Sequence, residues 1–153
     1  MNVELPIRFE DSLGYLVHHL LYTFRQGINR KLEGAGYNVR HEELGVLIVL
    51  NQEDDQTQSQ LSESLAKDKA VITRLLNRLV KDGLVERRHD AKDRRIVRAR
   101  LTTAGKQTSQ RLLPMLWDFI SKALEGVDQK EFKDACGVLQ QILANLRKLG
   151  RAC

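Results

Sequence analysis

Apolar residues recur along most of this chain three or four positions apart. Side chains with that spacing share one face of an α-helix, whereas strand positions alternate between two faces. The pattern predicts six amphipathic or buried helices, and Gly34 and Gly36 end the first of them. The predicted helices cover residues 13–34, 41–50, 58–66, 69–82, 103–125 and 132–149.

The third and fourth helices are separated by a tight turn. Thr57 and Gln60 have the spacing of a capping box, in which each side chain accepts from a backbone N–H at the helix start. Asp68 is a suitable N-cap for the fourth helix, and Gly83 can end it in the left-handed conformation. Thr102 can likewise cap the fifth helix.

Two strands are predicted between the fourth and fifth helices. They cover residues 84–88 and 96–101, and in the second strand apolar residues alternate with Arg98 and Arg100. The charged loop 89–95 joins them into a hairpin. The order of helix, turn, helix and hairpin is that of a winged helix-turn-helix, whose second helix enters the DNA major groove.

The predicted fold is therefore mainly α (α+β), with about six helices and a two-stranded β wing. A chain of 153 residues with 42% hydrophobic and 29% charged residues suits one domain over residues 1–153. Within it we expect residues 37–101 to form the winged helix-turn-helix DNA-binding lobe. Residues 1–36 and 102–153 supply the helices of a dimerisation region.

The positive charge of the chain is concentrated in one segment. The net charge is +5, but residues 67–100 hold 12 Lys and Arg against five Asp and Glu, whereas the rest of the chain is slightly acidic. A local basic surface favours the binding of a polyanion such as a nucleic acid, because each phosphate that the protein neutralises releases condensed counterions. The alternative is a solvated basic face that has no partner.

Other classes of protein lack their usual signals. The longest apolar runs are too short to span a bilayer, and the N-terminus is acidic where a signal peptide is basic. We therefore expect a cytoplasmic protein that is not associated with a membrane. Cys136 and Cys153 are too few for a disulfide framework or a metal cluster. The four histidines are scattered and no glycine-rich phosphate loop occurs, so we expect no cofactor, no metal and no enzyme activity.

The fourth helix presents polar side chains opposite its apolar stripe. Arg can bind guanine O6 and N7 together, Asn can bind adenine N6 and N7, and Thr can contact a base, a phosphate or a thymine methyl. Arg74 is the first candidate for base readout. For each of Asn77, Thr73 and Arg78, contact with the operator and an ordinary surface position are both open. The candidate DNA-binding residues of this helix are Lys69, Ala70, Thr73, Arg74, Asn77 and Arg78.

The wing loop supplies the second group of candidates, Asp93, Arg94 and Arg95. A narrow minor groove favours an inserted guanidinium, and Asp93 can orient one of the two arginines. A pairing of Arg95 with Asp93 that merely stiffens the hairpin is the alternative. The other wing arginines meet phosphate or pair internally; these are Arg87, Arg88, Arg98 and Arg100.

Three segments carry a resemblance to a known family. They are LAKDKAVITRLLNRLVKDGLVERR at 65–88, DRR at 93–95 and LTTAG at 101–105. Together they resemble the MarR (multiple antibiotic resistance regulator) family, whose wing signature is Asp-x-Arg followed by Leu-Thr-x-x-Gly. The resemblance places Arg95 in the minor groove. It also implies a triangular dimer built by the first, fifth and sixth helices, a pseudo-palindromic operator, and release by a small aromatic acid or by thiol oxidation.

The chain departs from the family pattern at two places. Many relatives carry a polar pair where this chain has Ala70 and Val71, so fewer base contacts are available there. The peroxide-sensing branch has a reactive cysteine early in the first helix, and here none precedes Cys136. We therefore do not carry the peroxide mechanism over, and Cys136 is better explained as a small buried residue than as a sensor.

The last helix has the apolar spacing of a coiled-coil seam, which needs a partner surface that a two-fold mate can supply. We expect the dimer interface to include Leu13, Leu16, Leu139, Ile142 and Leu146. Where relatives have an effector pocket, this chain has Tyr15, His19 and Tyr22, as candidates for binding a small aromatic or phenolic effector. The alternative is that these three pack against the partner subunit or face water.

The predicted function is that of a sequence-specific, DNA-binding transcriptional regulator, with an effector-responsive repressor first and an activator second. It would bind double-stranded DNA at a pseudo-palindromic operator as a homodimer. The alternative is a winged-helix module that docks protein or binds DNA without sequence preference.

Overall fold

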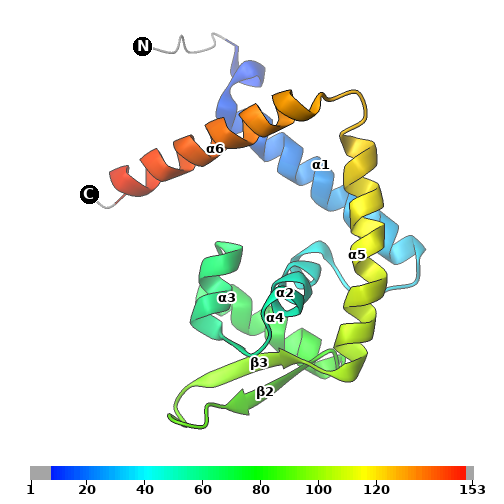
Figure 1. Cartoon of the computed structure of the whole chain (residues 1–153), viewed down its shortest axis with the longest axis vertical. Coiled ribbons are helices and arrows are strands. Elements are labelled where there is room, and N and C mark those ends of the chain that lie inside the picture. The colour runs from blue at the N-terminus through cyan, green and yellow to red at the C-terminus, as the bar shows by residue number, and fades with distance from the viewer. Residues whose placement is uncertain (1–7, 151–153) are drawn as a thin grey trace. The chain divides into compact units, whose positions relative to one another are not determined.

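The computed structural model describes residues 8–150 and contains the six predicted helices (Figure 1). A short 3-10 turn, Phe9–Asp11, precedes them. The helices are α1 (Leu13–Gly34), α2 (His41–Gln52), α3 (Gln58–Leu65), α4 (Lys69–Lys81), α5 (Thr103–Ala123) and α6 (Gln129–Leu149). The chain divides into two compact units, Met1–Trp117 and Asp118–Cys153, and α5 crosses the division.

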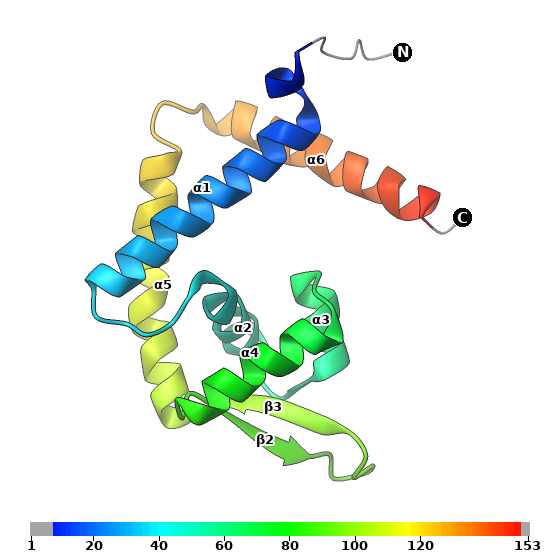
Figure 2. The ribbon, with the colours of Figure 1, turned by 180° about the vertical axis from the view of Figure 1, so that it is seen from behind.

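The first unit has its core where α2, α3 and α4 pack together above a small sheet (Figures 1 and 2). Helix α2 is buried on several sides, as its nearly unbroken apolar sequence predicts. Helix α4 instead buries one stripe and exposes the opposite face. The buried stripe consists of Ile72, Leu75, Leu76 and Leu79.

The sheet is larger than the predicted two-stranded wing. Strands β2 (Val85–His89) and β3 (Val97–Leu101) pair antiparallel from Val85 opposite Leu101 to His89 opposite Val97. A third strand, β1 (Gln56–Thr57), pairs with the other edge of β3, giving the order β1-β3-β2. The sequence did not predict β1, because two residues are too few to show an alternating pattern.

The predicted helix ends are confirmed in most cases. In the capping box of α3, Gln60 N–H donates to Thr57 Oγ1 at 3.2 Å and Thr57 N–H donates to Gln60 Oε1 at 2.8 Å. Gly83 adopts a φ of 70° after α4. Asp68 occupies the N-cap position of α4, but the prediction that its side chain caps the helix is wrong, since no such hydrogen bond forms.

Several apolar side chains of α1 and α6 are exposed in this chain. On α1, Leu13, Leu16 and Leu20 are 46%, 53% and 69% exposed. On α6 no residue is buried, and Leu139 and Leu146 are 39% and 57% exposed.

One of the two cysteines lies within the described residues. Cys136 on α6 is a half-buried free thiol, and Cys153 lies outside the described residues. Between residues 8 and 150, the helices are all too short or too polar to cross a membrane.

Candidate nucleic-acid interface

Helix α4 brings most of the predicted recognition residues onto one exposed face. The stripe of buried leucines fixes the rotation of the helix, so the positions between them must face outward. The exposed residues of α4 are Lys69, Ala70, Thr73, Arg74, Asn77, Val80 and Lys81. The side-chain donors of Lys69, Arg74, Asn77 and Lys81 are therefore accessible to a ligand that lies along the helix.

Arg78 has a different environment from the other predicted recognition residues. Its Nε lies 2.9 Å from Oε1 of Glu43, a carboxylate that is almost completely buried at the start of α2. Its Nη2 donates to both the carbonyl oxygen and Oδ1 of Asn38 at 3.2 Å. Glu43 Oε2 also accepts from the N–H of Arg40 at 2.8 Å, so Arg78 is part of the contact between α4 and the start of α2.

The first turn of α4 is fixed by a side chain that the sequence did not single out. Gln58, the first residue of α3, donates from Nε2 to the carbonyl oxygen of Lys69 at 3.0 Å and to Thr73 Oγ1. Thr73 Oγ1 in turn donates to Lys69 O at 2.8 Å. The hydroxyl of Thr73 is thus used within the protein, whereas its methyl group stays available. The sequence offered one signal for this contact: Gln58 is a polar residue at the start of α3, the helix that precedes the turn to α4.

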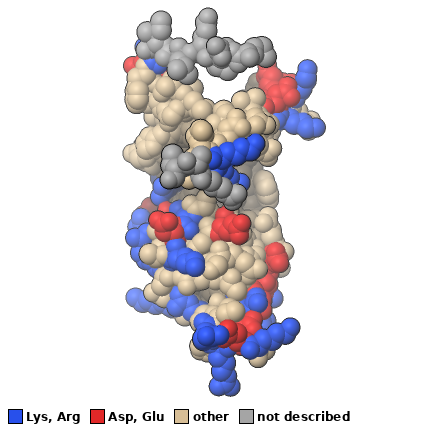
Figure 3. All heavy atoms as spheres, turned by 90° about the vertical axis from the view of Figure 1, so that its left-hand side faces the viewer, with Lys and Arg blue, Asp and Glu red and all other residues tan. Residues whose placement is uncertain are grey.

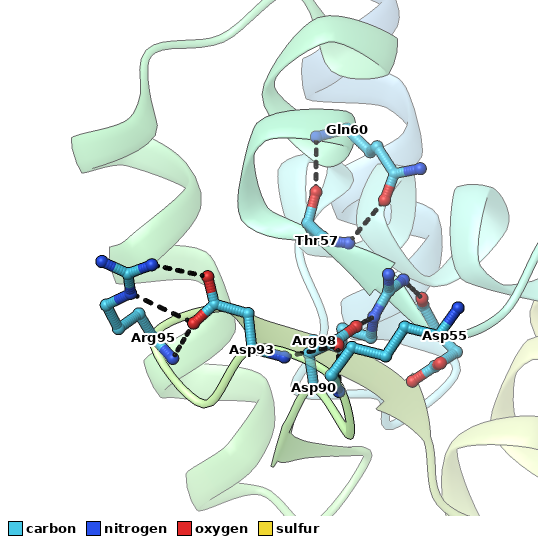
Figure 4. A network of polar contacts seen from close by, with 8 residues as sticks. Asp55, Thr57, Gln60, Asp90, Asp93, Arg95 and Arg98 are labelled. Atoms are coloured by element: carbon cyan, nitrogen blue, oxygen red, sulfur yellow. Dashed lines mark hydrogen bonds and ion pairs between the residues drawn. The ribbon is translucent and has the colours of Figure 1, made fainter.

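In the wing loop, Asp93 and Arg95 form the predicted pair (Figure 4). Asp93 Oδ1 accepts from the backbone N–H and Nε of Arg95 at 3.0 and 3.1 Å, and Oδ2 accepts from Nη2 at 3.2 Å. These hydrogen bonds to Arg95 lower the pKa of Asp93 below its ordinary value. Arg95 remains 91% exposed, so the pair orients the guanidinium without covering it.

A second carboxylate, Asp90, shapes the same loop and was not predicted. Its Oδ1 accepts from the N–H groups of Lys92 and Asp93 at 2.8 and 3.2 Å, and its Oδ2 accepts from Arg98 Nε at 2.5 Å. The hydrogen bond from Arg98, followed by those from the two amides, lowers the pKa of Asp90 to about 2. An aspartate at the start of a turn was the available sequence signal, because such side chains accept from amides two residues on.

The charges around the wing are of both signs (Figure 3). Acidic side chains form ion pairs with arginines of the same hairpin: Glu86 pairs with Arg88 at 2.9 Å and with Arg100 at 3.3 Å. Six basic residues of the 67–100 segment form no ion pair with any described residue; they are Lys69, Arg74, Lys81, Arg87, Lys92 and Arg94. The acids therefore fix the shape of the hairpin and leave a set of free cations.

The other predicted sites are only partly assembled. Tyr15 and His19 stack with ring centroids 5.5 Å apart, and Phe9 meets Tyr15 edge-on at 5.4 Å. Tyr22 is 56% exposed and makes no ring contact with a described residue. Of the predicted dimer residues, Leu13, Leu16, Leu139 and Leu146 are exposed and Ile142 is half-buried. Within residues 8–150, no three His, Cys, Asp or Glu side chains are grouped to hold a metal ion.

Comparison with known proteins decides the family. A sequence model of the MarR family matches residues 39–97, which include α2, α4 and the wing loop. The HTH-type transcriptional repressor YetL of Bacillus subtilis (strain 168) is 31% identical over 115 residues, which cover 72% of this chain and 69% of YetL. The chain belongs to the MarR family. This MarR-family protein is a winged helix-turn-helix transcriptional regulator and not an enzyme.

Solved structures of other members have the same fold. A mutant of Escherichia coli MarR in complex with operator DNA is 25% identical, with a TM-score of 0.79 over 86% of this chain and 93% of that one. BpsR of Bordetella bronchiseptica, whose DNA binding is regulated by 6-hydroxynicotinic acid, is 19% identical and shares the fold with a TM-score of 0.81, over 90% of this chain and 96% of that one.

Proposed function

We propose that this MarR-family protein represses transcription by binding a pseudo-palindromic operator in double-stranded DNA as a homodimer. The observation that carries the proposal is the exposed polar face of α4, which lies opposite its buried apolar stripe and beside the cationic wing. The likeness to Escherichia coli MarR bound to operator DNA supports the same use of these elements. Since the proposed target is DNA, we also place the protein in the cytoplasm.

Base readout in the major groove is assigned mainly to two residues of α4. Arg74 is exposed and free of ion pairs within the described chain, so its guanidinium can bind guanine O6 and N7 together. Asn77 is exposed one turn further along and can bind adenine N6 and N7. Ala70 and the methyl group of Thr73 suit a thymine methyl, and Lys69 suits a phosphate. Arg78 is assigned a structural role, because its ion pair with Glu43 joins α4 to α2.

The wing is assigned to the minor groove. Asp93 orients the guanidinium of Arg95 through Nε and Nη2 while the side chain stays exposed, which lowers the conformational entropy lost when the guanidinium enters the groove. Arg94 carries no ion pair among the described residues and can contact phosphate or the same groove. A guanidinium suits a narrow minor groove because it is more weakly hydrated than an ammonium group.

Dimerisation is assigned to α1 and α6, because each exposes large apolar side chains that water solvates poorly. A two-fold mate would cover these side chains with the same set from the partner. Two linked lobes would also reach half-sites about 34 Å apart, one helical turn of DNA.

An effector is part of the proposal, and its chemical class is a small aromatic or phenolic acid. The stacked Tyr15 and His19 offer an aromatic surface, and both rings carry a polar group. The regulation of BpsR by 6-hydroxynicotinic acid is an instance of such control within the same fold.

A selection from a random duplex library tests the proposal directly. The purified chain should enrich one inverted repeat, with half-site centres separated by about one helical turn. A selection that enriches no sequence would contradict the operator proposal and would favour a module for protein docking or non-specific DNA binding. Sedimentation of the protein with the enriched duplex should give two chains for each duplex.

A further inference from the structure

Arg98 joins the loop of the wing to the turn between α2 and β1. Its Nε donates to Asp90 Oδ2 at 2.5 Å, and its Nη1 donates to the carbonyl oxygen of Asp55 at 2.9 Å (Figure 4). The side chain starts from β3, the central strand of the sheet. One guanidinium therefore connects two segments that are 35 residues apart along the chain.

The Asp55 end of this connection is fixed. Asp55 has a φ of 61°, which a residue other than glycine keeps only where its surroundings hold it. Here the neighbouring Asp54 Oδ1 accepts from the N–H groups of Asp55 and Leu101 at 3.0 and 2.9 Å. Asp54 Oδ2 also lies 3.6 Å from Nζ of Lys106 in α5. The carbonyl oxygen of Asp55 is thus tied to β3 and to the start of α5.

The Asp90 end organises the part of the wing that carries Arg95. Asp90 accepts from the N–H groups of Lys92 and Asp93, and Asp93 accepts from the backbone and the guanidinium of Arg95. A continuous series of hydrogen bonds therefore runs from the α2–β1 turn through Arg98 to the exposed arginine of the loop. A two-stranded hairpin is only marginally stable alone, so such a connection decides how firmly its loop is held.

Arg98 itself is poorly placed to bind DNA phosphate. Its guanidinium is committed to two acceptors, and its side chain is 31% exposed. Arg88, directly opposite on β2, is 58% exposed, and among the described residues it forms an ion pair with Glu86 alone. The two arginines carry the same charge on paired strands but differ in what they hold, which makes Arg88 a matched control.

We propose that Arg98 is a positioning residue for DNA recognition: it fixes the wing loop to the α2–β1 turn, so that Arg95 enters the minor groove from a fixed base. The inference rests on the proposed operator binding and adds a residue that acts without touching DNA. A loop that moves freely must be ordered when the complex forms, and that ordering reduces affinity. Loss of Arg98 should therefore weaken operator binding although no DNA contact is removed.

Fluorescence anisotropy on the enriched duplex, from about 50 to 200 mM salt, tests the role of Arg98. Arg98→Gln should bind about tenfold more weakly than the wild type, within the range of indirect coupling, and should keep the same salt slope. Arg98→Lys, which can pair with Asp90 but cannot also reach Asp55 O, should recover part of the affinity. Arg88→Gln, which removes the same charge, should leave the wing loop intact. A salt slope reduced by about 0.9 in Arg98→Gln would show that Arg98 contacts phosphate and would overturn the inference.

Two further measurements separate the positioning role from a general effect on folding. In the Arg95→Ala background, Arg98→Gln should cost little more affinity, because Arg98 acts through Arg95. Amide hydrogen exchange in the free protein should speed up at Lys92 and Asp93 in Arg98→Gln but stay unchanged in Arg88→Gln. If the wild type binds no enriched duplex, the proposed function fails. If the wild type binds and Arg98→Gln binds equally well, only the role of Arg98 fails.

Discussion

Replacing Gly105 by alanine should destabilise the first unit, because the backbone of Leu84 leaves no space for a side chain. A Cβ at position 105 would lie 1.9 Å from the carbonyl oxygen of Leu84, so the backbone would have to move by more than 1 Å. That carbonyl accepts from the N–H of Thr102 at 3.1 Å, and Thr102 Oγ1 accepts from the N–H of Gly105 at 3.0 Å. The substitution therefore strikes the junction between the end of α4 and the start of α5.

The size of the effect follows from three contributions. Overpacking of this kind costs about 1–3 kcal/mol. The strained Thr102 hydrogen bond removes about 1 kcal/mol more. Alanine at a helical position returns about 1 kcal/mol relative to glycine. The free energy of unfolding should fall by about 1–3 kcal/mol, which is a large part of the stability of a small protein.

Urea unfolding followed by circular dichroism at 222 nm measures this change, with all variants at one protein concentration because association affects stability. Gly137→Ala is the matched control, since Gly137 lies within α6 and, apart from its neighbours and the adjacent helix backbone, no atom would lie within 4 Å of the new Cβ. The control should gain about 0.5–1 kcal/mol. An unchanged or increased stability of Gly105→Ala would refute the steric argument.

Three other perturbations test separate parts of the structure. Thr57→Ala removes the capping-box acceptor of α3 and should lower the free energy of unfolding in urea by about 1 kcal/mol, whereas Thr57→Ser should lower it much less. Equal losses in the two variants would contradict the role of the hydroxyl. Burial lowers the pKa of His41, so the unfolded chain binds more protons below about pH 6.5, and stability should fall as the pH falls through that value. His41→Gln should remove this part of the pH dependence in unfolding at pH 5 and 7, and His18→Gln, which removes an exposed histidine, should not. Leu146→Asp should give monomers by analytical ultracentrifugation while Lys133→Asp stays dimeric, and a dimeric Leu146→Asp protein would contradict the proposed use of α6.

The sequence predicted those features that depend on neighbouring residues. The leucine stripe of α4 determined which side chains are exposed, and the spacing of Thr57 and Gln60 determined where α3 begins. The pair of Asp93 and Arg95 was predictable for the same reason, since the partners are two positions apart.

Features that depend on distant segments were missed or left open. Strand β1 exists because Gln56 meets Ala99 on β3, and no local pattern encodes that pairing. Arg78 was left open between operator contact and ordinary surface, and its ion pair could not be predicted because Glu43 lies on another helix. Arg98 could be placed only among arginines that meet phosphate or pair internally, because its acceptors come from the wing loop and from a turn after α2.

The central claim is that Arg74 on the exposed face of α4 reads a base in the operator. Fluorescence anisotropy should compare Arg74→Ala with Arg111→Ala, a variant that loses an exposed arginine of α5, on the enriched duplex and on a scrambled one. We predict that Arg74→Ala loses about 1–3 kcal/mol on the enriched duplex and much less on the scrambled one, and that Arg111→Ala matches the wild type on both. Equal loss for Arg74→Ala on the two duplexes would show that the residue contacts only phosphate and would contradict the claim.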